Sequence, residues 1–127
     1  MEKKVVRTGL APEPVGPYSQ AVIAGGCVFC SGQIALDTVT GALMAGDIRQ
    51  ETARVMENLK GVLESAGCSF ENVVKTTIYV RDMNDFSSIN EVYGSFFNAE
   101  PPARATVQVA RLPKDANVEI DCIAVMS

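Results

Sequence analysis

The sequence predicts an α+β domain in which one mostly antiparallel, six-stranded sheet carries two helices packed on one face. Six segments have the alternating or β-branched pattern of strands, and two have the spacing of amphipathic helices. Their order is β-β-β-α-β-α-β-β, so helices and strands do not alternate strictly, which favours α+β. The length of 127 residues predicts a single domain over residues 1–127.

The first three predicted strands lie in the N-terminal third of the chain. An extended segment at 3–7 leads into a proline-rich loop at 11–17, where proline fixes φ and biases the preceding residue to extended geometry. The apolar segments 18–24 and 27–35 follow, and the Gly25-Gly26 pair between them is typical of a hairpin turn. We therefore expect these two segments to pair in an antiparallel hairpin.

Two segments have helical spacing. The clearer one runs from Asp47 to Ala66, where Asp47 suits the N-cap and Gly67 suits the position just after the helix. The second helix is expected to begin at Asp85 and to end before Pro101-Pro102, because proline cannot continue a helix.

The remaining strands are expected at 73–80, 105–110 and 118–125. In the last of these, one face carries Ile120, Cys122 and Ala124, and the other carries Glu119, Asp121, Ile123 and Val125. Both faces therefore hold apolar side chains. We expect the sheet face without helices to be partly buried as well, as it would be in a closed homo-oligomer.

Composition excludes several functions. The net charge is −4 with a pI near 4.8 and no basic run, so we do not expect nucleic acid to be the main partner. No apolar run approaches the ~20 residues that span a bilayer, and residues 1–6 lack the apolar core of a signal peptide, which predicts a cytosolic protein. Because the chain has no histidine, histidine-based triads and histidine metal sites are excluded.

The Cys27-x-x-Cys30 spacing is that of a redox or zinc motif, but its context is a strand. Residues three apart on a strand point to opposite faces, and no second closely spaced Cys or His pair is present. We interpret Cys27, Cys30, Cys68 and Cys122 as reduced structural cysteines.

Arg104 and Glu119 are the strongest candidates for a functional site. Arg104 follows Pro101-Pro102 at the entrance of a predicted strand, where its guanidinium could hold a carboxylate with two parallel hydrogen bonds. Glu119 is expected to face it from the neighbouring β-segment and to hold a water, and Asp121 beside it should raise one of the two carboxyl pKa values. The alternatives are a surface salt bridge for Arg104 and an exposed, lysine-paired strand residue for Glu119.

Two further positions are candidates for ligand contact. Tyr18 follows Gly16-Pro17 at a strand start, and its alternative is packing with a solvated hydroxyl. Ser31-Gly32 interrupts an apolar strand with a glycine, which permits close approach of a ligand to the backbone, and its alternative is a simple bulge.

The chain resembles the RidA family (YjgF/YER057c/UK114) nearly from end to end. The motifs that carry the resemblance are Gly16-Pro17-Tyr18-Ser19-Gln20-Ala21, Ser31-Gly32-Gln33, Asn58-Leu59, Val74-Lys75-Thr76-Thr77, Pro102-Ala103-Arg104, Val109-Ala110-Arg111-Leu112-Pro113 and Val118-Glu119-Ile120.

The resemblance implies a chorismate-mutase-like fold and a homotrimer with sites between subunits. It implies hydrolysis of reactive enamine/imine intermediates, chiefly 2-aminoacrylate and 2-aminocrotonate, to 2-keto acids and ammonia, the activity of a 2-iminobutanoate/2-iminopropanoate deaminase. It implies no cofactor and no metal.

Three catalytic residues are implied by the same resemblance. Arg104 matches the family's carboxylate-binding arginine, Glu119 matches the glutamate that orients the hydrolytic water, and Tyr18 matches a tyrosine that lines the pocket.

Substrate contacts are implied at five more positions. Ser31 and Gly32 match the strand whose backbone contacts the ligand, and Phe86 and Asn90 match positions in the pocket wall. Thr106 departs from the family pattern, since many members have cysteine or serine there. Binding through its backbone amide should survive, but a role that needs a thiol is in doubt.

Three other functions stay open. The chain could be a trimer that binds or senses 2-keto acids without turnover, because this would use the same pocket. An RNA-cleaving translation inhibitor is opposed by the acidic pI and the missing histidine. A chaperone would need a large exposed apolar patch.

Overall fold

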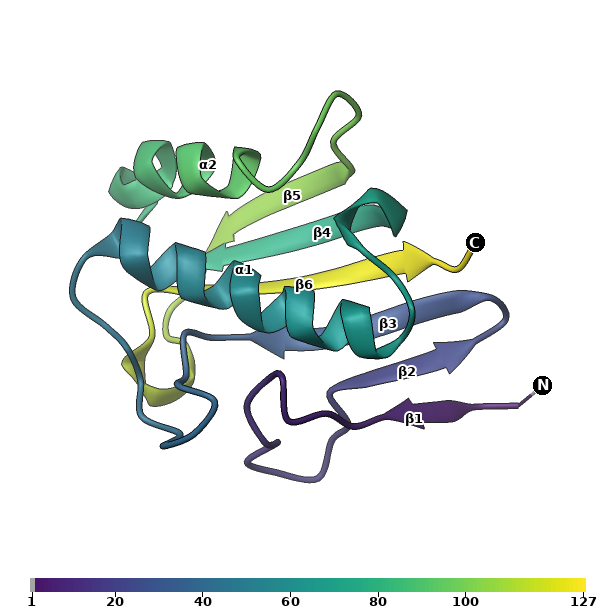
Figure 1. The fold of residues 1–127 in the computed structure, drawn as a ribbon. Coiled ribbons are helices and arrows are strands. Elements are labelled where there is room, and N and C mark those ends of the chain that lie inside the picture. Colours follow the sequence, from purple (N-terminus) through teal and green to yellow (C-terminus); the bar gives the residue numbers. More distant parts are fainter. Residues whose placement is uncertain (1) are drawn as a thin grey trace.

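The structure is a computed structural model that describes residues 2–127, so residue 1 of the predicted domain lies outside the described part. Both helices of the described chain cover the same face of a six-stranded sheet (Figure 1). The predicted order of strands and helices is confirmed, with short 3-10 helices added in the connections. The α+β class is therefore confirmed, and we call the sheet face away from the helices the open face.

The predicted elements are all present, and the bounds differ most for β2, for β5 and for the end of α2, which stops at Gly94 rather than just before Pro101. The strand β2 begins at Ala21 rather than at residue 18, because the Tyr18 amide donates to the Gly16 carbonyl at 2.9 Å in a tight turn. The elements are β1 (Lys4–Val6), β2 (Ala21–Ala24), β3 (Cys27–Gln33), α1 (Ile48–Ser65), β4 (Val73–Val80), α2 (Phe86–Gly94), β5 (Ala103–Gln108, predicted at 105–110) and β6 (Val118–Val125).

The ends of α1 follow the local signals. The Asp47 carboxylate accepts a hydrogen bond from the Arg49 backbone N–H at 2.7 Å, as an N-cap does. After the helix, Gly67 adopts a φ of +80°, which a glycine tolerates without strain. The Gly67 and Cys68 amides then donate to the carbonyls of Glu64 and Leu63, which is a Schellman motif.

The sheet is mixed, which corrects the expectation of a mostly antiparallel sheet. Its strand order is β1-β2-β3-β6-β4-β5, and β4 pairs with β5 in parallel, whereas the other neighbouring pairs are antiparallel. The parallel pair arises because α2 carries the chain back from the end of β4 to its beginning. The crossover also separates β5 from β6 in space although they are consecutive along the chain.

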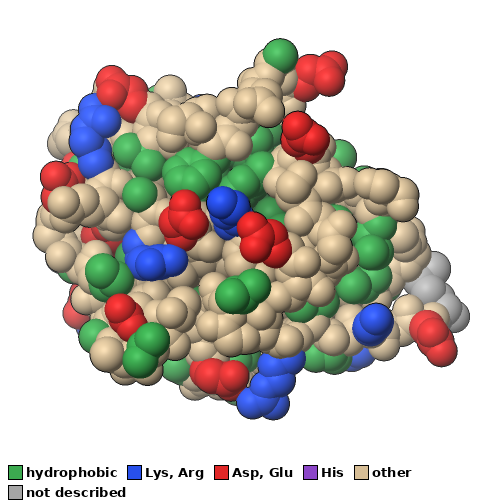
Figure 2. Space-filling model, in the orientation of Figure 1, with side chains coloured by type: hydrophobic (Ala, Val, Ile, Leu, Met, Phe, Trp, Pro, Cys, Tyr) green, Lys and Arg blue, Asp and Glu red, His purple; other side chains and the backbone are tan. Residues whose placement is uncertain are grey.

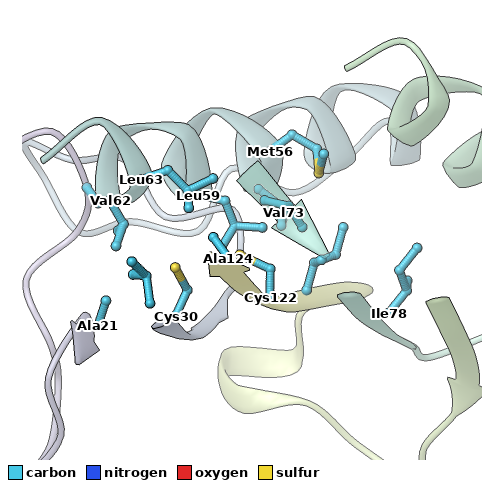
Figure 3. Close-up of a cluster of buried hydrophobic side chains, with 14 of the residues drawn as sticks. Ala21, Cys30, Met56, Leu59, Val62, Leu63, Val73, Ile78, Cys122 and Ala124 are labelled. Carbon is cyan, nitrogen blue, oxygen red and sulfur yellow. The ribbon is translucent and has the colours of Figure 1, made fainter. Parts of the chain in front are cut away.

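The core lies between α1 and the sheet (Figure 3). Met56, Leu59 and Leu63 of α1 are fully buried against strand residues such as Ile78 and Cys122. Burying a side chain of this size contributes about 1.5–3 kcal/mol relative to its exposure. This packing fixes which strand residues face the helices.

The two faces of β6 divide as predicted. Val118, Ile120, Cys122 and Ala124 are buried beneath the helices, and Glu119, Asp121 and Ile123 are only partly buried on the open face. The open face also exposes Phe29, Val107 and Val125, each by more than 40%. It is therefore a partly apolar surface without a covering layer in the single chain.

The four cysteines are free, and Cys27 and Cys30 lie on opposite faces as expected. Cys30, Cys68 and Cys122 are buried, whereas Cys27 is partly buried. A hydrogen bond with Cys30 raises the pKa of the Cys122 thiol, and burial of the thiol is the second-largest cause of the increase. A thiol held protonated in this way is inert, which fits a structural role.

Buried polar side chains hold the loops at the end of the sheet where β3 ends and β6 begins. The Glu51 carboxylate of α1 is fully buried and accepts from the Asn117 backbone N–H at 2.8 Å and from its side-chain amide at 2.9 Å. The Gln20 amide donates to the carbonyls of Thr8, Ala11 and Pro12. Because these groups are buried and paired, they fix the loop before Glu119 and the N-terminal loop.

Among residues 2–127, no helix has both the length and the hydropathy to cross a membrane.

Candidate functional site

The predicted site residues fall into two groups on opposite faces of the sheet. Arg104 of β5 lies opposite Thr76 of β4, which is buried under the helices. Glu119 of β6 lies opposite Tyr79 of β4, on the open face. The strand β4 separates them, and two strand spacings amount to about 10 Å. The expectation that Glu119 faces Arg104 from a neighbouring strand is therefore wrong within one chain.

Four of the predicted residues line one cleft of about 340 Å³. These are Tyr18, Ser31, Gly32 and Glu119. Tyr18 comes from the loop before β2, Ser31 and Gly32 come from the end of β3, and Glu119 comes from the start of β6. We call this the Glu119 cleft.

Gly32 makes room for the Glu119 carboxylate. A Cβ atom built on Gly32 would collide with Glu119 Oε2 and lie only 2.8 Å from its Cδ. The pairing of β3 with β6 shifts register between Cys30 and Gln33, so the glycine sits in a bulge. Gly32 thus lies in a bulge and also permits a close approach to the backbone. The group that approaches it is the Glu119 side chain of the same chain.

Ser31 is tied to the chain segment before β2. Its hydroxyl donates to the Ser19 carbonyl at 2.6 Å, and its backbone N–H donates to the Gln20 carbonyl at 3.0 Å. The Tyr18 hydroxyl accepts from the Val15 N–H at 3.4 Å and its side chain stays exposed. The part of the cleft formed by Ser31 and Tyr18 is therefore held by hydrogen bonds to the backbone.

The Glu119 carboxyl lies in an environment that disfavours its charge. Burial raises the pKa of Glu119, and the nearby Asp121 carboxylate raises it further. Asp121 in turn accepts a hydrogen bond from the Tyr79 hydroxyl at 3.1 Å. The expected effect of Asp121 is confirmed in direction, but burial is the larger cause. A carboxylate with a raised pKa is a stronger base than an exposed one.

Lys114 is a residue of the cleft that the sequence did not single out. It lines the Glu119 cleft and donates from Nζ to the Gly41 carbonyl at 3.3 Å. Lys114 and Asp115 both have positive φ, 54° and 57°, in a turn closed by the Arg111–Asp115 ion pair. Two adjacent non-glycine residues in this conformation are uncommon. Sequence could have pointed to this turn only through its closeness to Glu119.

The second group surrounds Arg104, on the helix side of β5. Arg104 Nη1 donates to Asn90 Oδ1 at 2.7 Å, and its Cζ lies 5.5 Å from the centre of the Phe86 ring. In the described residues Arg104 forms no ion pair, so the alternative of a surface salt bridge does not describe it. Since a guanidinium has five N–H donors, most of them stay available to a ligand. We call this the Arg104 group.

Tyr93 also belongs to the Arg104 group, although no motif of the sequence pointed to it. Its ring centre lies 5.2 Å from Arg104 Cζ, within the range of a cation–π contact. Its buried hydroxyl shares a 2.7 Å hydrogen bond with Thr76 Oγ1, and burial raises the pKa of Tyr93. A tyrosine at helical spacing is typical of a core residue, and no local signal distinguishes Tyr93 as a functional one.

Thr106 lies two residues beyond Arg104 and on the same face of β5. It is opposite Ile78 of β4, and its buried Oγ1 has no hydrogen-bond partner within the described residues. Buried hydroxyls are usually paired, so this atom is an available polar group beside Arg104.

Metal chemistry finds no ligand set among residues 2–127. No group of three His, Cys, Asp or Glu side chains there could hold a metal ion.

The described residues offer two other chemical groups. One is the Arg104 guanidinium, held by Asn90 and aromatic rings, and the other is the basic carboxylate of Glu119 in its cleft. The first suits a carboxylate ligand and the second suits a water molecule.

Comparison with known proteins gives the class to which this fold and these residues belong. The family model described as Endoribonuclease L-PSP matches residues 8–126. A RutC family protein from Synechocystis sp. is 52% identical, with 99% of this chain and 98% of that protein covered. The crystal structure of a putative endoribonuclease from Thermotoga maritima superposes with a TM-score of 0.96 at 46% identity, covering 100% of this chain and 99% of the other.

A mouse protein named 2-iminobutanoate/2-iminopropanoate deaminase is 47% identical over 97% of this chain and 91% of its own length. The chain belongs to the Endoribonuclease L-PSP family, which is the YjgF/RidA family. The resemblance inferred from the motifs is therefore confirmed.

Proposed function

We propose that this protein is a hydrolytic deaminase that converts small 2-imino acids, such as those formed from 2-aminoacrylate and 2-aminocrotonate, into 2-keto acids and ammonia. The observation that carries the proposal is the pairing of two chemistries in one chain. Arg104 is a positioned guanidinium with donors to spare, and Glu119 is a partly buried carboxyl with a raised pKa. The 47% identity to a deaminase supports the same activity.

The site in this proposal is shared between two copies of the chain. Arg104 and Glu119 lie on opposite faces of one sheet, so a single chain cannot bring both to one small substrate. A second copy can supply the missing half. We propose a homotrimer with the open faces turned toward one another, because its exposed Phe29, Val107 and Val125 would then be buried.

The proposed reaction begins with the carboxylate of the substrate bound by Arg104. The aromatic rings and Asn90 hold the guanidinium, so the substrate is oriented when it binds. The enamine tautomerises to the imine. Glu119 of the other copy accepts a proton from a water molecule, whose oxygen attacks the imine carbon.

The resulting tetrahedral carbon carries one hydroxyl and one amino group. In forming it, Glu119 has already returned the proton of the water to the imine nitrogen. Glu119 then accepts the hydroxyl proton and transfers it to the amino nitrogen, so that ammonia leaves and the carbon–oxygen double bond of the keto acid forms as the carbon–nitrogen bond breaks. One imine and one water thus give one keto acid and one ammonia.

The test generates 2-aminoacrylate with a dehydratase and follows keto-acid formation. We expect Arg104→Ala to lower kcat/KM by about 10- to 100-fold, the size of a lost charge-assisted hydrogen bond. Arg81→Ala, an exposed arginine that forms no ion pair among the described residues, is the matched control and should keep full activity. Equal acceleration by Arg104→Ala and the native protein would contradict the proposal.

Two other activities are distinguished by the same preparations. If calorimetry detects binding of 2-ketobutyrate but the native protein does not accelerate imine hydrolysis, the protein is a 2-keto acid sensor. RNA cleavage should be measured as well, because the family is named for an endoribonuclease. Cleavage that persists in Arg104→Ala and changes with purification would come from a contaminant.

A further inference from the structure

A second cavity of about 310 Å³ lies beyond the C-terminal end of α2. It is bounded by residues 70–71, at the 3-10 helix before β4, and by residues 96–100, in the loop that projects between α2 and β5 (Figure 1). It shares no lining residue with the Glu119 cleft and contains none of the Arg104 group. Nothing in the proposed deaminase reaction uses it.

Three phenylalanine rings build one side of this cavity. Phe70 meets Phe96 and Phe97 in edge arrangements, with ring centres 5.7 Å and 5.3 Å apart, and Phe97 rests on Tyr93 at 4.8 Å. All three phenylalanines are only partly buried. Edge packing holds the rings in fixed orientations, and the face of an aromatic ring attracts cations.

The rest of the cavity is electronegative. Glu71 and Glu100 line it, and neither carboxylate is in an ion pair in the described part of the chain. The C-terminal end of α2, which carries partial negative charge, adjoins the cavity and has no basic residue in its last turn. In Figure 2, red acidic side chains stand at the projecting loop at the upper right beside green hydrophobic ones, and no blue side chain adjoins them in this view.

We propose that this cavity binds a small organic cation of the quaternary or N-methylated ammonium class. Such a cation presents apolar methyl groups to the rings and spreads its charge over them, and the two carboxylates complement that charge. A bare metal ion fits less well, because only two carboxylates line the cavity and the rings cannot coordinate it. The volume lies at the small end of ligand pockets, which suits a molecule the size of choline.

Choline and its uncharged carbon analogue, 3,3-dimethylbutan-1-ol, form the decisive pair of probes. The two have nearly the same shape, so any difference in affinity reports the charge. We expect choline to shift the ring signals of selectively labelled Phe70, Phe96 and Phe97 in a saturable way, and to bind about tenfold more tightly than the alcohol. Equal affinity for both probes, or no saturable shift, would overturn the proposal.

Variants assign the binding to this cavity. We expect Phe96→Leu, and separately the double variant Glu71→Gln with Glu100→Gln, to weaken choline binding by about tenfold. Glu64→Gln on α1, which removes an exposed carboxylate outside the cavity, is the matched control. A loss in the control equal to that in the double variant would show attraction by net charge alone and would contradict the site. Circular dichroism of each variant confirms that it is folded, and unchanged imine hydrolysis shows that the result is independent of the proposed deaminase.

Discussion

At the scale of single residues, the carboxyl of Glu119 has the most consequences. Burial raises its pKa, and the neighbouring Asp121 carboxylate raises it further. Its position depends on the missing side chain of Gly32. Both features can be tested by single substitutions that leave the strand in place.

Glu119→Gln should abolish imine hydrolysis and stabilise the fold at neutral pH. A carboxyl whose folded-state pKa is raised favours folding while it is protonated, and this contribution is lost as the pH rises through the raised pKa. Glutamine is never charged and avoids that loss. Urea unfolding should therefore give a larger free energy of unfolding for the variant at pH 7 and no advantage below the pKa of an exposed glutamate.

The same shift predicts the pH profile of the native enzyme. If Glu119 must be ionised to accept a proton from water, kcat/KM should fall as the pH drops through its raised pKa, above the range of an exposed glutamate. If kcat/KM instead falls only in the pH range where an exposed glutamate titrates, a group other than Glu119 accepts the proton of the water.

Gly32→Ala should lower kcat/KM by about 100-fold, because the new methyl group would displace the Glu119 carboxylate by an ångström or more. Gly94→Ala is the control, since a Cβ there meets no atom within 4 Å. Steady-state kinetics of both variants with the same imine provides the measurement. Full activity of Gly32→Ala would show that the exact place of the carboxylate is unimportant.

At the scale of secondary-structure elements, α2 matters because it carries the partners of Arg104. Phe86, Asn90 and Tyr93 all lie on this helix, and Arg104 lies on β5, which the helix precedes. A hydrogen bond between the Tyr93 and Thr76 hydroxyls ties the helix to β4. The orientation of the guanidinium therefore depends on how α2 is docked.

Tyr93→Phe should separate the two contacts of Tyr93: its hydroxyl docks α2 on β4, and its ring lies beside Arg104. It leaves the Thr76 hydroxyl unpaired in a buried place, which costs about 1–3 kcal/mol of unfolding free energy, yet it keeps the ring beside Arg104. Urea unfolding should detect the loss, and imine hydrolysis should change little. Tyr93→Leu removes the ring as well and should raise KM, because Arg104 is then less well oriented.

At the scale of the whole molecule, the arrangement of the two half-sites governs assembly. One chain places its arginine and its glutamate on opposite faces of a sheet, with β4 between them. A site shared between copies is the arrangement that would let both act on one small molecule. It would also cover the apolar side chains of the open face.

Mixing two impaired variants tests the shared site. When Arg104→Ala and Glu119→Gln chains are unfolded together and refolded in equal amounts, about a quarter of the interfaces of a cyclic trimer should pair an intact arginine with an intact glutamate. About a quarter of native activity should then return. Activity that stays at the level of the separate variants would place both residues in one chain's site, and sedimentation measurements give the number of chains directly.

The sequence by itself determined the parts of this protein that depend on local pattern. The bounds of β4 and β6, the caps of α1 at Asp47 and Gly67, and the division of β6 into two faces all follow from residues close along the chain. The motifs around Tyr18, Gly32, Arg104 and Glu119 were enough to identify the family.

Only the tertiary structure decided which of those residues meet. The α2 crossover makes β5 parallel to β4 and leaves β4 between Arg104 and Glu119, which no local pattern encodes. The tertiary structure also places Tyr93 beside Arg104 and Lys114 in the Glu119 cleft. The physical reason is that strand order and helix docking are set by burial of the whole core, through contacts between residues far apart in the chain.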